Sequence, residues 1–162
     1  MKTLIANISE DLHSLKEVAK LAFSTTPDSS LEEWLSFDEM VKMIHEERGV
    51  AIKAVSEEGE VLGMTYAQQE SPINGKEGRE KWVIIIAAVK PSATGGGIGS
   101  ALLTELEKQV KLQGAVKMFT YTNKDDEKVV NFYRKNGYED VGWIRDYQYG
   151  RDNSAVFLLK YL

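Results

Sequence analysis

Residues 95–99 are the part of the chain whose residue types most directly suggest chemistry, because four of these five residues are glycine. Glycine has no Cβ, so the backbone N–H groups of a glycine-rich turn can converge on one point. If a helix follows the turn, its first N–H groups have no intrahelical partner and carry partial positive charge. Main-chain donors of this kind bind phosphate groups. We therefore predict a pyrophosphate site built mainly from the backbone of Thr94, Gly95, Gly96, Gly97, Ile98, Gly99 and Ser100.

Two familiar phosphate-binding motifs do not fit this segment. A P-loop ends in Gly-Lys-Ser/Thr, whereas here Gly97 is followed by Ile98 and Gly99. A dinucleotide-binding motif needs a third glycine, and Leu102 stands in its place. A tight turn between a strand and a helix also uses glycine, but it needs fewer glycines than this segment has.

Asn123 and Tyr133 are two further side chains that could take part in a reaction. A tyrosine phenol with a pKa of about 10 can donate a proton to a leaving group. Tyr133 could instead belong to the core, because it lies beside Val130 on one face of a predicted helix. Asn123 could cap a strand end or a helix start. From the residue pattern alone, a core position is the favoured interpretation of Tyr133.

The hydrophobic pattern predicts the elements that must position these residues. Residues 82–89 are a continuous apolar run, which is typical of a strand buried on both faces. After the glycines, apolar residues recur at helical spacing and Gly114 ends the helix; this stripe comprises Ile98, Leu102, Leu103, Leu106 and Val110. The pattern then predicts, in order, a strand at 116–122, a helix at 125–136 capped by Gly137, and an antiparallel hairpin of 138–148 and 155–162 around a turn at 149–153.

The first half of the chain predicts further strands and helices. In order, these are a strand at 3–8, a helix at 10–24, one or two helices within 31–44, and a hairpin of strands at 50–56 and 61–69 with its turn at 57–60. The polar stretch 27–30 breaks the helical pattern, and the polar segment 71–81 predicts a mobile loop. The order β-α-α-β-β-β-α-β-α-β-β predicts a mixed α/β fold, in which helices cover the faces of one sheet.

Two segments together resemble the GNAT superfamily of N-acetyltransferases. The family signature is Arg or Gln, two residues, Gly, one residue, then Gly or Ala, after a strand that ends in Val-x-Pro. The stretch from Val89-Lys90-Pro91 to Gly99 resembles this signature, with Thr94 in place of the Arg or Gln. The stretch from Asn123 to Tyr138, which contains Phe132-Tyr133-Arg134-Lys135-Asn136-Gly137, resembles the family's strand-end Asn and the helix that follows it. The resemblance runs from Val61 to Tyr138, and the preceding part of the chain matches in element order only.

This resemblance implies a three-layer fold: a mostly antiparallel, twisted sheet of about seven strands with a central splay, flanked by about four helices. It implies acetyl-CoA as cosubstrate and direct transfer of its acetyl group to an amine. The backbone of Ala87 and Val89 would contact the donor, with the Val89 N–H at the thioester carbonyl or the developing oxyanion. Asn123 would hydrogen-bond the pantetheine arm or an ordered water, a role that it could combine with a cap. Tyr133 would protonate the departing thiolate. Because Thr94 departs from the family pattern, pyrophosphate binding would depend on the backbone.

The general base is not evident from the sequence. An amine must lose a proton before or during its attack. Many members of the family carry a Glu on the strand that here reads Ile84-Ile85-Ile86-Ala87-Ala88, which has no carboxylate. Glu70 is the first candidate and Glu80 the second, although each could be a solvated surface carboxylate and water could serve instead. A non-catalytic acyl-CoA sensor on the same fold is the alternative function.

Composition and charge limit the other possibilities. The length of 162 residues predicts a single domain over 1–162. The net charge of -5 argues against nucleic-acid binding. The lack of cysteine excludes disulfides and a cysteine nucleophile, and no metal-ligand spacing is evident, so we expect no metal. The run 82–89 is too short to span a membrane and the N-terminus does not resemble a signal peptide, so we expect a cytoplasmic protein; the resemblance allows a homodimer.

Overall fold

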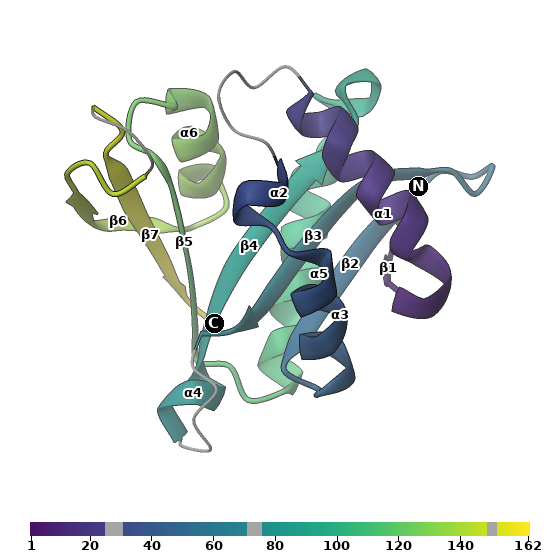
Figure 1. The fold of residues 1–162 in the computed structure, drawn as a ribbon, viewed down its shortest axis with the longest axis horizontal. Coiled ribbons are helices and arrows are strands. Elements are labelled where there is room, and N and C mark those ends of the chain that lie inside the picture. The colour runs from purple at the N-terminus through teal and green to yellow at the C-terminus, as the bar shows by residue number, and fades with distance from the viewer. Residues whose placement is uncertain (25–30, 71–75, 149–151) are drawn as a thin grey trace.

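A seven-stranded sheet runs through the structure in the order β1-β2-β3-β4-β5-β7-β6 (Figure 1). The structure is a computed structural model that describes residues 1–24, 31–70, 76–148 and 152–162. Neighbouring strands are antiparallel except for β4 and β5, which are parallel. The strands are β1 Lys2–Ile5, β2 Gly49–Val55, β3 Val61–Gln69, β4 Lys81–Val89, β5 Lys117–Asn123, β6 Glu139–Ile144 and β7 Ala155–Tyr161.

Helices cover both faces of this sheet. The helices are α1 Ile8–Phe23, α2 Leu31–Trp34, α3 Phe37–His45, α4 Lys76–Glu80, α5 Ile98–Leu112 and α6 Glu127–Lys135, with a short 3-10 helix at Pro91–Ala93. One core contains Leu102 of α5 and Val130 of α6, and the other contains Leu15 of α1 and Met40 of α3. In Figure 1, α1 and α3 lie in front of the sheet and α5 lies behind it. This architecture confirms the predicted three-layer, mostly antiparallel fold class.

A bulge at Ile85 changes the face to which the side chains of β4 point. The pairing of β3 with β4 skips Ile85 between Ile84 and Ile86. As a result, Ile84 belongs to the core under α5 and α6, whereas Ile86 belongs to the core under α1 and α3. In a regular strand these two residues would share one face. The extra residue therefore changes which positions of the apolar run face each core.

β4 and β5 separate soon after they begin. Their parallel pairing joins residues 81–83 of β4 to residues 117–119 of β5. Beyond Val83, β4 continues to pair with β3, while β5 continues to pair with β7. Figure 1 shows the two strands close together near α4 and far apart at their other ends. This is the predicted central splay: beyond Val83 and Phe119 the two strands are no longer paired with each other. The region between their diverging backbones is called the opening below.

The structure corrects the predicted boundaries at the start of the chain and before β4. Ile8 does not end the first strand but begins α1, because the Asn7 side chain caps that helix by accepting the Ser9 N–H at 3.3 Å. The loop predicted at 71–81 was wrong in its second part, where Lys76–Glu80 form α4 and Lys81 starts β4. Residues 71–75 lie outside the described residues, and so does the polar stretch 27–30.

Two boundaries in the last third of the chain also differ. α6 begins at Glu127 rather than at residue 125, because Asp126 caps it by accepting the Val129 N–H at 3.1 Å. β6 ends at Ile144 instead of residue 148, because Asp146 takes a positive φ of 50° that a strand does not allow. Of the predicted turn at 149–153, residues 149–151 are not described. Within the ranges that the structure does describe, no helix is both long and apolar enough to cross a membrane.

Candidate active site

The glycine-rich turn leaves the N-terminus of α5 uncovered. Gly97 is the N-cap residue of α5, and no side chain there accepts an N–H of the first turn. Gly95 and Gly97 take φ values of +88° and +76°, which favour glycine strongly, whereas Gly96 has no such constraint. A Cβ built on Gly95 or Gly97 would meet no atom within 4 Å. The turn therefore presents open backbone at the positive end of a 15-residue helix, which suits a phosphate group.

Gly99 serves packing. A Cβ built on Gly99 would lie 3.0 Å from Cε2 and 3.2 Å from Cζ of Phe132 in α6. The lack of a side chain at this position therefore lets the first turn of α5 lie this close to Phe132 of α6. Since Tyr133 follows Phe132, this contact brings the glycine-rich turn and the predicted catalytic tyrosine into one region of the structure.

The other residues of the turn contribute in different ways. The Thr94 hydroxyl donates to the carbonyl oxygen of Pro91 at 2.9 Å and so closes the 3-10 helix. Ile98 is buried in the core, so only its backbone can face a ligand. Ser100 is half-buried, and its carbonyl oxygen accepts the Thr104 hydroxyl at 2.9 Å. Gly95, Gly96 and Gly97 are exposed and can offer only backbone groups, and phosphate binding by this turn remains a prediction.

The edge of β4 that faces the opening carries backbone groups from Ala87 and Val89. The Lys90 N–H donates to the carbonyl oxygen of Leu62 next to β3, at 2.9 Å. Because N–H groups alternate in direction along a strand, those of Val89 and Ala87 point away from β3. They therefore point into the opening between β4 and β5, where the parallel pairing has already ended.

Tyr133 lies at the point where β4 and β5 separate. Its ring is buried, and its hydroxyl shares a hydrogen bond with the hydroxyl of Thr120 on β5. The Thr120 hydroxyl in turn donates to the carbonyl oxygen of Ile84 at 3.2 Å. Ile84 is the first residue of β4 beyond the pairing with β5. This chain of contacts places the phenol at the narrow end of the opening.

The environment of Tyr133 keeps its phenol protonated. Burial raises the pKa of Tyr133 to about 12, and the hydrogen bond from Thr120 opposes this rise. A phenol with this pKa remains neutral at physiological pH, so it is available as a hydrogen-bond or proton donor.

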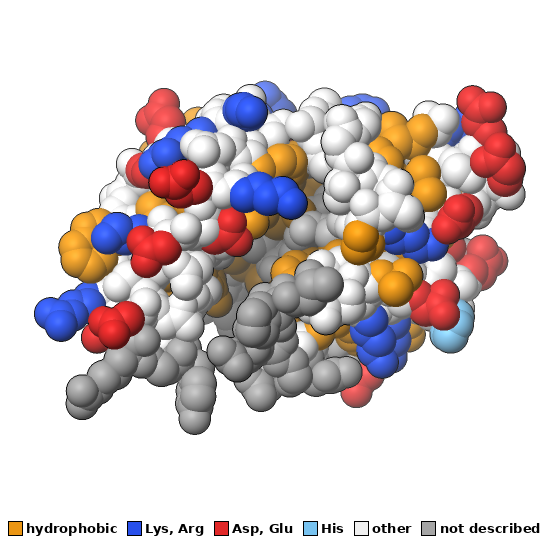
Figure 2. Space-filling model, turned by 90° about the horizontal axis from the view of Figure 1, so that it is seen from above, with side chains coloured by type: hydrophobic (Ala, Val, Ile, Leu, Met, Phe, Trp, Pro, Cys, Tyr) orange, Lys and Arg blue, Asp and Glu red, His pale blue; other side chains and the backbone are white. Residues whose placement is uncertain are grey.

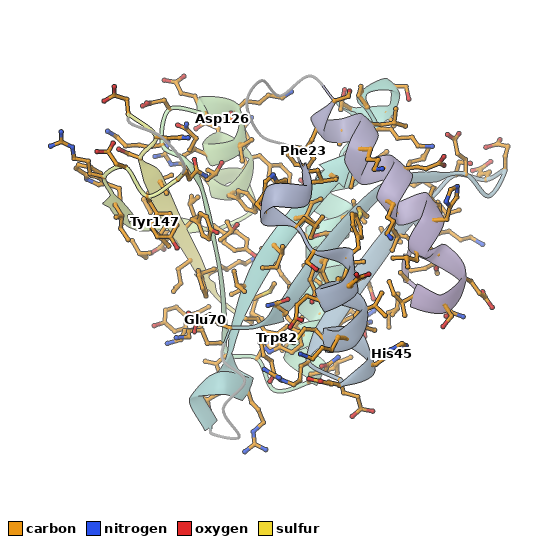
Figure 3. The ribbon with its side chains drawn as sticks, in the orientation of Figure 1. Phe23, His45, Glu70, Trp82, Asp126 and Tyr147 are labelled. Atoms are coloured by element: carbon orange, nitrogen blue, oxygen red, sulfur yellow. The ribbon has the colours of Figure 1, made fainter. Side chains whose placement is uncertain are left out.

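Asn123 ends β5 at the wide end of the opening. Its side-chain oxygen accepts the Asp125 N–H at 2.8 Å, and its amide nitrogen donates to Oδ1 of Asn153 at 2.7 Å. These bonds fit the interpretation of Asn123 as a strand-end and turn residue. The amide nitrogen has a second N–H, which can still bind a ligand. In Figure 3 the neighbouring Asp126 marks this end, where α6 begins.

Glu70 lies toward the other end of β4. Its carboxylate forms an ion pair with Nζ of Lys81 at 2.8 Å, and its N–H donates to the Lys81 carbonyl oxygen at 3.1 Å. Lys81 precedes Ile84 by three residues, which is about 10 Å of strand. Glu70 therefore lies beside the still-paired ends of β4 and β5 (Figure 3), and the structure does not bring it next to Tyr133. Its role as general base remains a prediction, as does that of Glu80.

Thr120 and Phe132 belong to this site, and the sequence analysis missed both. Thr120 is a polar residue at a buried position of β5, and that pattern is the signal that could have identified it. Phe132 stood out only as part of a motif, and its contact with Gly99 depends on how α5 and α6 pack.

An aromatic surface lies on the opposite face of β5. Tyr121 follows Thr120 and points the other way, and its ring centroid lies 5.1 Å from that of Tyr147 and 5.4 Å from that of Phe157. Tyr121 and Tyr147 are 42% and 46% exposed, so both rings offer apolar surface to solvent. Seen from above, in Figure 2, the molecule is hollowed near its centre, with hydrophobic side chains in the depression.

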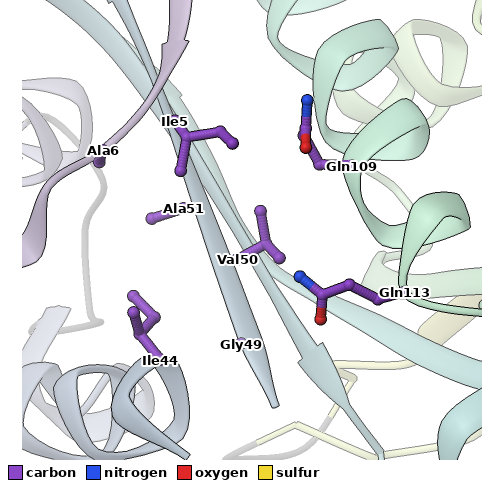
Figure 4. Close-up of a pocket in the computed structure, with 8 residues that line it drawn as sticks. All are labelled: Ile5, Ala6, Ile44, Gly49, Val50, Ala51, Gln109 and Gln113. Atoms are coloured by element: carbon purple, nitrogen blue, oxygen red, sulfur yellow. The ribbon is translucent and has the colours of Figure 1, made fainter. Parts of the chain in front are cut away.

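A separate cavity of about 100 Å³ lies at the other edge of the sheet. Ile5, Val50 and Gln109 are among the residues around it (Figure 4). It lies between the β1–β2 edge and the C-terminal half of α5, so it is not part of the opening between β4 and β5. Among the residues with described positions, no group of three or more His, Cys, Asp or Glu side chains could hold a metal ion.

The family follows from the sequence match. A model of the acetyltransferase (GNAT) family matches residues 11–138, which is most of the chain. The chain therefore belongs to the acetyltransferase (GNAT) family, and the predicted family is confirmed. Mycothiol acetyltransferase of Paenarthrobacter aurescens (strain TC1) is 31% identical over 99 residues, which are 60% of this chain and 29% of that relative. The match thus spans less than a third of that curated relative's length.

Solved structures with the same fold agree with this result. Ribosomal-protein-alanine N-acetyltransferase from Brucella melitensis superposes with a TM-score of 0.82 at 21% identity, covering 100% of both chains. An aminoglycoside 6'-N-acetyltransferase complexed with coenzyme A has a TM-score of 0.76 at 20% identity, covering 99% of this chain and 97% of that one. At these identities the likeness establishes the fold.

Proposed function

We propose that this chain transfers the acetyl group of acetyl-CoA directly to a primary amine of a small molecule or a protein. The observation that carries the proposal is the position of the Tyr133 hydroxyl, at the point where β4 and β5 separate. A proton donor at this point lies at the narrow end of an opening whose wide end meets the glycine-rich turn. That arrangement suits a donor molecule with a diphosphate at one end and a reactive thioester at the other.

The length of the opening supports an extended donor. Ile84 and Val89 are five residues apart, which corresponds to about 16 Å of strand. The turn at 94–100 would hold the diphosphate through backbone N–H groups, and the N–H groups of Ala87 and Val89 would bind the pantetheine arm between the strands. Asn123 would contribute the free N–H of its side-chain amide from β5.

The chain's residues would then assist transfer without an acyl-enzyme. A neutral amine attacks the thioester carbonyl, a backbone N–H of β4 stabilises the oxyanion, and the C–S bond breaks. Tyr133 donates to the departing sulfur, while the proton lost by the amine passes to water or a carboxylate. Since a thiol has a pKa of about 8.5, a phenol with a pKa of about 12 is the weaker acid by roughly three orders of magnitude. Proton transfer from Tyr133 to the sulfur would therefore be unfavourable unless a neighbouring hydrogen-bond donor stabilised the phenolate.

Both candidate carboxylates, Glu70 and Glu80, already have interaction partners. Glu70 would have to leave its ion pair with Lys81 to accept a proton, and Glu80 also has a partner. We therefore propose that water in the opening relays the amine proton, with Glu70 as its acceptor. The exposed rings of Tyr121 and Tyr147, on the other face of β5, would contact the carbon skeleton of the acceptor.

An assay with a panel of amines tests the proposal. The panel would include a polyamine, an aminoglycoside, an amino acid ester and a peptide, with free CoA thiol and acetylated product measured together and acetyl-CoA affinity measured by calorimetry. Thiol release that matches acetyl-amine formation supports the proposal. Tight binding of acetyl-CoA without transfer to any amine would favour the acyl-CoA sensor. The absence of a carboxylate at residues 84–88 supports that alternative. No binding of acetyl-CoA would overturn both functions.

A further inference from the structure

We propose that Thr120 is a positioning residue for Tyr133. The Thr120 hydroxyl changes its hydrogen-bond partner when Tyr133 gives up its proton. This inference rests on the proposed function, because it assigns Thr120 a part in the same transfer. Thr120 is 5% exposed and lies one residue past the last pair that joins β5 to β4. Its hydroxyl contacts two groups at the narrow end of the opening: the carbonyl oxygen of Ile84, at 3.2 Å, and the hydroxyl of Tyr133.

The Ile84 carbonyl needs a donor that the sheet does not supply. The pairing between β4 and β5 ends at Val83 and Phe119, so the next carbonyl on this edge of β4 has no strand partner on β5. A buried carbonyl without a hydrogen bond is costly, and the Thr120 hydroxyl satisfies it. This contact alone would be a purely structural role, and a test has to separate that role from the proposed one.

The second contact gives the hydroxyl its proposed role. A hydroxyl has one proton and two acceptor lone pairs. While Thr120 donates to Ile84, it can accept the proton of Tyr133, which holds the phenol in place. When the Tyr133 O–H bond breaks and a new S–H bond forms on the leaving thiolate, the Thr120 proton can turn from Ile84 to the phenolate oxygen. No covalent bond of Thr120 changes, and the proton and charge balance lies entirely between the phenol and the sulfur.

This second bond should matter most when Tyr133 is charged. A buried phenolate has no water around it to stabilise its charge. A single hydrogen-bond donor therefore stabilises the phenolate more than it stabilises the neutral phenol. Hydrogen bonds to charged groups correspond to a factor of about 10 to 100 in an equilibrium or a rate. Loss of the Thr120 hydroxyl should therefore lower kcat by about this factor and leave the KM for acetyl-CoA nearly unchanged.

Thr65 offers a matched control. It is also buried, with 0% exposure, and its hydroxyl donates to the carbonyl oxygen of Ile86 at 2.9 Å. Both threonines therefore donate to a carbonyl of β4 next to the bulge at Ile85. Thr65 lies on β3, on the other side of β4 from Thr120 and Tyr133. Thr65→Val thus removes the same kind of hydrogen bond to a carbonyl of β4 and leaves the surroundings of Tyr133 unchanged.

The kinetic experiment compares Thr120→Val, Thr120→Ser and Thr65→Val with the wild-type protein. Both valine variants should unfold at lower denaturant concentration, because each removes a buried hydrogen bond to a carbonyl of β4. Thr120→Val alone should lower kcat, and Thr120→Ser should restore most of it because it keeps the hydroxyl. If Thr120→Val keeps the wild-type kcat, or if Thr65→Val loses as much activity, Thr120 has only a structural role. If the wild-type protein itself transfers no acetyl group, the proposed function fails and the next measurement decides on Thr120.

The second measurement does not depend on activity. A fluorinated tyrosine with a more acidic phenol, incorporated at position 133, lets the phenolate be titrated by absorbance without alkaline unfolding. Thr120→Val should raise the pKa of this phenol by about one pH unit or more, while Thr120→Ser and Thr65→Val should not. An unchanged phenol pKa in Thr120→Val would overturn the proposed hydrogen bond to the phenolate.

Discussion

The ring of Phe132 lies against Gly99, where an added Cβ would come within 3.0 Å of Phe132 Cε2. This contact joins the first turn of α5, which follows the glycine-rich turn, to α6, which carries Tyr133. Two motifs that are far apart in the sequence are therefore positioned by one packing interaction. The absence of a side chain at residue 99 has a structural cause that is independent of any ligand.

Gly99→Ala should destabilise the fold, because the new methyl group overlaps the Phe132 ring. Overpacking of this kind costs about 1–3 kcal/mol of unfolding free energy. Chemical denaturation of Gly99→Ala, and of the double variant that also carries Phe132→Leu, measures the effect. The smaller side chain should recover part of the loss. An unchanged midpoint for Gly99→Ala would mean that α5 and α6 move apart freely.

Gly96→Asp should weaken binding of acetyl-CoA without strain in the backbone. A Cβ on Gly96 has its nearest neighbour at 4.0 Å, and this glycine does not take a positive φ. The added carboxylate should repel the diphosphate and raise the Kd by about tenfold or more. Isothermal titration with CoA and with acetyl-CoA measures this change.

Gln113→Glu is the control for Gly96→Asp. It adds the same single charge at the C-cap of α5, at the far end of the 15-residue helix. Its Kd should stay within about twofold of the wild-type value, since screening removes most of a charge effect beyond about 10 Å. Equal affinity of Gly96→Asp and the wild-type protein would show that the diphosphate does not bind at this turn.

Tyr133→Phe should lower kcat while leaving the affinity for acetyl-CoA nearly unchanged. The substitution removes the hydroxyl at the narrow end of the opening and keeps the ring, so the expected loss is about 10- to 1,000-fold. Tyr138→Phe is a matched control, because Tyr138 is also buried and its ring packs against Tyr133 at 5.4 Å. If both variants lose kcat equally, the effect comes from packing and not from the Tyr133 hydroxyl.

Local patterns were enough to predict much of the fold. The continuous apolar run, the glycines and the amphipathic stretch predict strand, turn and helix because each depends on neighbours in the sequence. The φ values of Gly95 and Gly97 agree with the predicted turn. Caps explain the boundary errors: Asn7 and Asp126 accept N–H groups of α1 and α6 and move the helix starts.

Long-range pairing decided what the sequence could not predict. The bulge at Ile85 lies within an unbroken apolar run, so neither its position nor the change of face that it causes is visible in residue types. The hydrogen bond from Thr120 to Ile84 joins residues that are 36 positions apart in the chain. It exists because β4 and β5 separate at that point. Glu70 was predicted from its place at a strand end, and its ion pair with Lys81 depends on the antiparallel pairing of β3 and β4.

Buried tyrosines should make the protein lose stability in alkali. Burial raises the pKa of Tyr133 to about 12, and it also raises the pKa values of Tyr66 and Tyr138. In the unfolded chain these phenols ionise near a pKa of about 10. A folded-state pKa above the unfolded value contributes stability that is complete below pH of about 10 and is lost as pH rises through the folded-state pKa.

For Tyr133 alone this contribution is about 3 kcal/mol, lost between pH of about 10 and about 12. Denaturant unfolding over this range, with phenolate absorbance followed in parallel, should show stability falling before the buried phenols ionise. Tyr66→Phe removes one buried phenol, whose hydroxyl donates to Oε1 of Gln68 at 2.7 Å, so it should be less stable at neutral pH but lose less stability in alkali. If every phenol ionises near its ordinary pKa while the fold persists, water reaches these rings and the buried environment described for Tyr133 is wrong.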